Sequence, residues 1–118
     1  DREEAEELLE RAGSDRRAKA LRHHIFLEDF FSKNDAAELE HEAQAEPTDP
    51  RTRYRWGVML AAQARFEEAI DELLESVRLD RNFADDAARK AILAVFDIVG
   101  LEEPLVRDSQ RRLSQVLF

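Results

Sequence analysis

Apolar residues recur every three or four positions through most of this chain, and short polar breaks separate the runs. This spacing is typical of amphipathic helices, whereas no alternating run of β-branched residues reaches strand length. We therefore expect an all-α chain of antiparallel helical hairpins with about six helices. The periodic segments predict helices over Arg2–Ala12, Asp15–Ser32, Ala36–Ala45, two between Pro50 and Asn82, Asp86–Val99, and from Pro104 to the end.

The N-terminal part is predicted to contain a break and a fully covered helix. Gly13 suits the end of a first helix, and Ser14 or Asp15 suits the cap of the next. The segment Asp15–Ser32 is apolar over more than half of its circumference, so we expect neighbours on two sides of it. The helix Ala36–Ala45 has a thin apolar side and is expected to be the loosest element.

The stretch Pro50–Asn82 predicts a hairpin with a turn at Ala64–Arg65. Gly57 and Ala69 lie where the two helices must come close. Aligning Ala69 with the alanine of the 34-residue tetratricopeptide pattern places Gly57 on its glycine, and Pro47 falls on the closing proline of the preceding repeat. The stretch thus resembles a tetratricopeptide repeat. Two positions depart from that pattern, namely Arg53 and Arg81, and a generic helical hairpin is the alternative.

The expected organisation is one domain over residues 1–118, since this length suits a single domain. Within it we expect a divergent repeat over 1–49, a regular repeat over 50–83 and a capping helix pair over 84–118. Together these would stack as a short tetratricopeptide-like superhelix. The chain begins without Met inside a helical pattern, and we interpret it as a fragment of a longer protein.

The charge distribution narrows the range of partners. The net charge of −9 argues against binding to nucleic acid and to anionic membrane surfaces. The charge is uneven, because residues 1–10 hold six acids whereas the following segment is basic. Solvated helix faces are the simplest interpretation of both segments. The basic island consists of Arg11, Arg16, Arg17, Lys19 and Arg22.

No pattern in the chain indicates catalysis or a cofactor. The absence of cysteine excludes disulfides, thiolate chemistry and cysteine-based zinc sites. His24 and Glu28 have metal-compatible spacing, but a zinc site needs three or four ligands. No nucleophile elbow and no glycine-rich phosphate loop occurs. We expect no enzyme activity, no metal and no cofactor, and no apolar run reaches the length of a membrane span.

Two groups of residues are candidates for protein binding. In a stacked-hairpin solenoid, the first helix of each repeat lines the concave face. The expected residues there are Arg51, Tyr54, Arg55 and Val58. The last helix supplies the second group, which either packs on the preceding helix or is partly exposed for a partner: Leu105, Arg112, Leu113, Val116, Leu117 and Phe118.

The C-terminal third also resembles a known family. The run Asp85-Asp86-Ala87-Ala88-Arg89-Lys90-Ala91, followed by Gly100, Pro104 and the terminal Leu117-Phe118, is similar to the C-terminus of the thioredoxin-domain co-chaperones called chaperedoxins. The resemblance covers roughly Pro50–Phe118. A chain without cysteine supplies only the scaffold and docking half of such a protein.

The resemblance implies a bacterial cytoplasmic protein that holds unfolded or oxidised clients and hands them to a chaperonin of the GroEL type. By position, it assigns chaperonin docking to Pro104–Phe118. The alternative is a generic tetratricopeptide adaptor that binds a peptide in its concave face. A small hydrolase is the distant third possibility.

Overall fold

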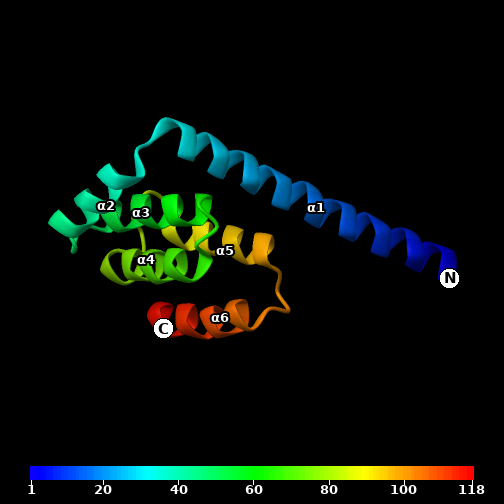
Figure 1. Cartoon of the computed structure of the whole chain (residues 1–118). Coiled ribbons are helices and arrows are strands. Elements are labelled where there is room, and N and C mark those ends of the chain that lie inside the picture. Colours follow the sequence, from blue (N-terminus) through cyan, green and yellow to red (C-terminus); the bar gives the residue numbers. More distant parts are fainter.

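The computed structural model describes residues 1–118 and contains six helices and no strand. Five of the helices stack side by side in a body, whereas the first extends beyond it (Figure 1). The all-α prediction is therefore confirmed. The helices are α1 (Arg2–Lys33), α2 (Ala36–Ala45), α3 (Pro50–Ala62), α4 (Phe66–Leu79), α5 (Ala87–Val99) and α6 (Pro104–Leu117).

The hairpin of α3 and α4 forms the centre of the fold, as its sequence predicts. A Cβ atom on Gly57 would lie 2.8 Å from the Leu73 side chain, so only glycine allows this approach of the two helices. Ala69 is completely buried in the same contact. Ala64 closes the turn with a φ of 61°, and the backbone N–H of Arg65 donates to the Leu60 carbonyl at 2.9 Å.

Polar side chains fix the entry of this hairpin. The Asp49 carboxylate accepts a hydrogen bond from the backbone N–H of Arg51 and caps α3. Buried Ser76 on α4 donates from its Oγ to the Pro50 carbonyl at 2.8 Å. Arg53 donates to the Pro47 carbonyl at 2.8 Å and to both carboxylate oxygens of Glu72. The departure from the repeat pattern at this position thus supplies a polar clamp between α3, α4 and the preceding loop.

Helix α1 corrects two expectations from the sequence. It is continuous from Arg2 to Lys33, and Gly13 lies within it without ending it. Gly costs about 1 kcal/mol in a helix interior, and Ser14 and Asp15 are weak helix formers too, but the segments on either side of this short stretch are rich in Ala, Leu, Glu and Arg. In addition, α1 is covered on one side only, because Leu21, Ile25 and Phe31 are each more than half exposed.

The path of α1 places its two halves in different environments. The C-terminal half crosses α3 and α5, and the N-terminal half leaves the body (Figure 1). No residue of α1 is fully buried. The core consists of eighteen apolar residues from α2 to α6, to which α2 contributes only Leu39 and Ala43.

The last two helices pack differently from a simple hairpin. Helix α5 contacts α4 and α1, whereas α6 lies mainly against α4. The sequence offered packing on the preceding helix, α5, as one possibility for α6. This possibility is wrong, because α6 packs mainly on α4. The reason is that α5 is already covered by α1 and α4, while α4 has an apolar side left for Val106 and Leu113.

The link between α4 and α5 is an unusual left-handed turn. Ala84, Asp85 and Asp86 have consecutive φ values of 47°, 57° and 63°. Left-handed backbone costs roughly 1–2 kcal/mol per L-residue. Two ion pairs connect this turn to the start of α5. Asp85 pairs with Lys90 at 3.0 Å, and Asp86 pairs with Arg89 at 3.5 Å.

Candidate protein-interaction surface

The concave side of the α3–α4–α5 stack is occupied by α1. His23 Nε2 lies 3.1 Å from the Asp97 carboxylate on α5, and Lys19 Nζ lies 3.5 Å from the same oxygen. Leu27 and Phe30 pack partly buried against the core. Only a small apolar cavity of about 30 Å³ remains under α1. This part of α1 therefore fills the face on which repeat proteins of this shape take peptides.

The four residues predicted for the concave face do not form one open surface. Val58 is 1% exposed, so its prediction as a partner contact is wrong, because the stack beneath α1 encloses it. Arg55 is engaged within the chain, where it binds the Glu42 carboxylate at 2.9 Å and donates to Asn34. Arg51 is exposed and has no ion-pair partner.

Tyr54, the fourth of these residues, is half-buried. Its ring packs on Phe83 with the ring centroids 5.9 Å apart. Burial raises the pKa of the Tyr54 hydroxyl above its usual value, because the phenolate would lose hydration there. Tyr54 therefore packs α3 against the link before α5. Its side chain has a packing role and is not fully exposed for contact with a partner.

The C-terminal candidates separate into packed and free residues. Leu113 is 7% exposed, so a role in direct partner contact is wrong for it. Leu105, Val116 and Leu117 are partly buried against the core. Arg112 forms an ion pair with Asp71 on α4 at 2.8 Å. Phe118 is 98% exposed and is the free apolar residue of this group.

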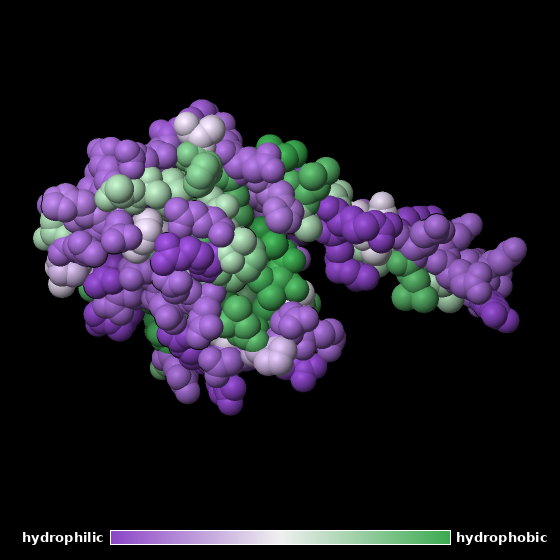
Figure 2. All heavy atoms as spheres, viewed as in Figure 1, coloured by the Kyte–Doolittle hydropathy of each residue, from purple (hydrophilic) through white to green (hydrophobic).

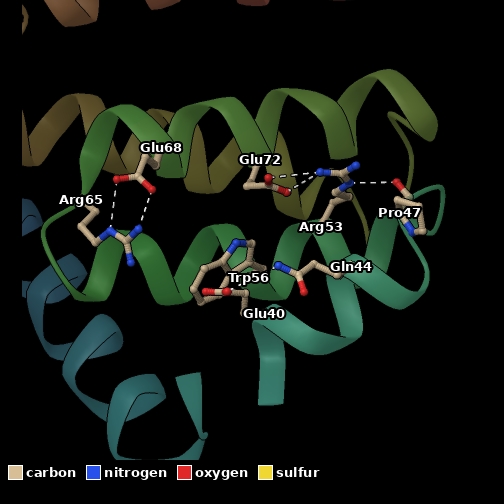
Figure 3. Close-up of a pocket in the computed structure, with 9 residues that line it drawn as sticks. Glu40, Gln44, Pro47, Arg53, Trp56, Arg65, Glu68 and Glu72 are labelled. Carbon is tan, nitrogen blue, oxygen red and sulfur yellow. Dashed lines mark hydrogen bonds and ion pairs between the residues drawn. The ribbon is translucent and has the colours of Figure 1, made fainter. Parts of the chain in front are cut away.

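A polar groove between α2, α3 and α4 was not predicted from the sequence (Figure 3). It has a volume of about 350 Å³, and Trp56 lies in its floor. In the figure, Arg53 and Glu72 face each other at one end, and Arg65 and Glu68 at the other. Trp56 falls on an apolar position of the repeat pattern, and this position predicts that its side chain packs in the core. The pattern therefore gives no indication of the groove beside Trp56.

The electrostatics of this groove are mostly balanced. Arg65 and Glu68 form an ion pair at 2.6 Å, and the hydrogen bond that the Arg65 guanidinium donates to the Glu68 carboxylate raises the pKa of Arg65. Glu72 is bound by Arg53. Glu40 receives only a long contact of 3.5 Å from Gln44. The groove therefore offers one carboxylate without a cationic partner, which suits a Lys or Arg side chain of a bound protein.

Other kinds of site find little support in the structure. No group of three or more His, Cys, Asp or Glu side chains is arranged to hold a metal ion. None of the six helices combines the length and the apolar composition needed to cross a membrane. The polar groove and the exposed Phe118 are two features open to a protein partner.

Comparison with known proteins establishes the family. A family model described as tetratricopeptide repeat matches residues 31–118, which include the end of α1 and all of α2 to α6. The chain belongs to the tetratricopeptide repeat family. No curated protein and no solved structure matches it. Tetratricopeptide domains are generally non-catalytic modules that mediate protein–protein interactions.

Proposed function

We propose that this chain is the helical-repeat interaction domain of a thioredoxin-like co-chaperone from the bacterial cytoplasm. In this role it binds a chaperonin of the GroEL type and unfolded or oxidised client proteins, and performs no catalysis. The family membership supports an interaction role. The resemblance of Pro50–Phe118 to the chaperedoxins supports the co-chaperone role. We interpret residues 1–49 as a divergent repeat, 50–83 as a regular repeat and 84–118 as a C-terminal cap.

The exposed Phe118 is the observation that carries this proposal. The apolar side of α6 is anchored to α4 through Val106 and Leu113, so the helix holds its terminal residue in a defined place. Arg81 adds a hydrogen bond from its Nη1 to the Leu117 carbonyl at 3.1 Å. An exposed aromatic residue directly after a docked helix fits an anchor for an apolar pocket on the chaperonin.

Deletion of the whole last helix is a poor test of this docking. Removing Pro104–Phe118 would also remove Val106, Ser109 and Leu113 from the core. A loss of binding would then reflect unfolding as well as a lost contact. A point substitution at Phe118 avoids this problem because the side chain makes almost no contact within the chain.

The test measures the dissociation constant of two variants for a purified GroEL-type chaperonin by biolayer interferometry. Phe118→Ser should weaken binding about tenfold or more, since loss of an anchor costs more than about 1.4 kcal/mol. Leu93→Ser is the matched control, because Leu93 is also an exposed apolar residue and lies on α5, outside the docking helix. Equal affinity of both variants and the unaltered chain would contradict the proposal.

The generic adaptor is the second candidate function, and the position of α1 disfavours it. A peptide entering the concave face has to displace α1 and break the contacts of Lys19 and His23 with Asp97. A coding sequence for a thioredoxin-like domain upstream of Asp1 would favour the co-chaperone, and a different upstream domain would favour the adaptor.

A further inference from the structure

Residues 1–12, at the N-terminal end of α1, form an arm that does not pack against the body of the protein. Residues 1–11 are all exposed, yet Ala5, Leu8, Leu9 and Ala12 form one apolar stripe at helical spacing. Leu8 is 62% exposed and Leu9 is 73% exposed. Figure 2 shows this apolar patch on the protruding segment, separated from the body. A helical segment of this length is only marginally stable in water unless it packs against another surface. The apolar stripe is therefore suited to contact with a partner.

The charge along α1 changes sign in the middle of the exposed segment. Residues 1–10 hold six acids and one Arg, and the basic island, Arg11–Arg22, follows directly. Within the island, Arg16, Arg17 and Arg22 have no carboxylate within 4 Å, in a chain whose net charge is −9. The arm and the island are therefore complementary in charge, and within one straight helix only Arg11 reaches the arm, where it lies 3.9 Å from Glu7.

A cleft of about 630 Å³ opens where α1 leaves the body. Arg16, Arg17 and Lys19 line its α1 side, and Leu101 provides exposed apolar surface opposite. The two carboxylates of the cleft are already engaged, Asp97 with Lys19 and His23, and Glu102 with Arg107 at 2.9 Å. The cleft is thus a site with unpaired arginines beside apolar surface, and it suits an acidic amphipathic helix.

We propose that two copies of this chain pair through antiparallel α1 helices, with the arm of each in the cleft of the other. An antiparallel arrangement brings each acidic arm against a basic island, whereas a parallel one would place like charges together. The apolar stripe of each arm then faces the apolar residues of the partner's cleft, which are Ala20, Phe96 and Leu101, and this contact forms the seam. Two-fold symmetry closes such an exchange as a dimer.

The occupant is a second copy because the arm has the chemistry that the cleft requires. The acidic residues flank the stripe on both sides, since Glu4 lies one turn before Leu8 and Glu6 one turn before Leu9. Each arm therefore presents carboxylates on either side of two leucine side chains. No other segment of the chain combines an exposed apolar stripe with this density of acids.

The experiment is sedimentation velocity over about 1 to 500 µM protein at low and high salt. The unaltered chain should be dimeric at the upper concentrations in low salt. About 1 M salt, with a screening length of only ~3 Å, should shift it toward monomer by at least tenfold in the dissociation constant. A chain that stays monomeric throughout this range overturns the proposal, whatever other protein then fills the cleft.

Charge reversal separates this pairing from any other self-association. Arg16→Glu/Arg17→Glu and Glu4→Lys/Glu6→Lys should each be monomeric, because each places like charges across the seam. An equimolar mixture of the two variants should form heterodimers, since both contacts become attractive again. Arg78→Glu/Arg111→Glu, on α4 and α6 and outside the cleft, is the matched control and should dimerise like the unaltered chain. Dimers of either single variant, or a mixture that stays monomeric, would overturn the proposal.

Discussion

Leu73 occupies the space that a side chain on Gly57 would need, and this contact sets the distance between α3 and α4. A Cβ atom at Gly57 would lie 2.8 Å from Leu73 Cγ and Cδ2, and 3.3 Å from the Leu73 backbone nitrogen. Leu73 is completely buried, so its side chain has no free volume to enter. The hairpin at the centre of the fold therefore depends on the absence of one methyl group.

Substitution of this glycine should destabilise the protein. Gly57→Ala should lower the free energy of unfolding by about 1–3 kcal/mol, because overpacking outweighs the gain in helix propensity. The fluorescence of Trp56, the single tryptophan, follows unfolding in urea. Gly13→Ala is the matched control. It should be neutral or stabilise by roughly 0.5–1 kcal/mol, since the new methyl group meets only the flexible ends of Arg16 and Arg17. Equal effects of the two substitutions would contradict this account.

The turn between α3 and α4 should be improved by a glycine. Ala64 has a φ of 61°, where an L-residue is strained and glycine is not. Ala64→Gly should raise the free energy of unfolding by about 0.5–1 kcal/mol, measured by urea denaturation. Ala62→Gly, two residues earlier in the helix, is the comparison and should lower it. Destabilisation by Ala64→Gly would show that this backbone conformation is not the native one.

Loss of the Asp97 carboxylate should loosen α1 without unfolding the body. Lys19 and His23 both contact this side chain, and α1 has no fully buried residue of its own. Asp97→Asn should cost about 0.5–1 kcal/mol, because the contact is partly exposed to solvent. Amide hydrogen exchange should accelerate over residues 19–30 and stay unchanged in α4. Asp71→Asn, which removes the partner of Arg112 on α6, is the control and should leave α1 unaffected.

Tyr54 should make the protein sensitive to alkaline pH. Its folded pKa lies above the usual value of 10.0, so the folded state holds its proton more tightly than the unfolded state. The stability from the neutral hydroxyl is therefore complete below pH 10 and is lost as the pH rises through the folded pKa. Tyr54 is the single tyrosine, so tyrosinate absorbance titrates this group alone.

The matching variant is Tyr54→Phe, which keeps the contact with Phe83 and removes the titrating group. Its stability should fall less than that of the unaltered chain between neutral pH and pH values above 10. Identical pH profiles of the two proteins, measured by thermal unfolding, would contradict the assigned burial of this hydroxyl.

The central hairpin could be predicted from the sequence because its signals are local. The positions of Gly57, Ala69 and the turn at Ala64 follow from helical periodicity and one repeat pattern, and the structure has all of them. The polar partners of Arg53 could not be predicted, since Glu72 approaches it only after the hairpin has closed.

The two ends of the chain could not be predicted, because their packing depends on distant elements. A glycine followed by capping residues is a strong stop signal, yet Gly13 remains helical because the longer segments before Gly13 and after Asp15 are rich in good helix formers. The burial of Val58 depends on α1, which is far from it in sequence. The contact of α6 with α4 likewise joins elements that are separated in the sequence by the whole of α5.

Amide hydrogen exchange of this chain with and without a purified GroEL-type chaperonin tests the proposed function most directly. The account predicts slower exchange on binding at the end of α6, around Arg112–Phe118, and no change over α3 or the part of α1 that covers it. Protection of α3 and α5 with faster exchange in α1 would instead show binding in the concave face. No protection anywhere at saturating chaperonin would contradict the co-chaperone assignment.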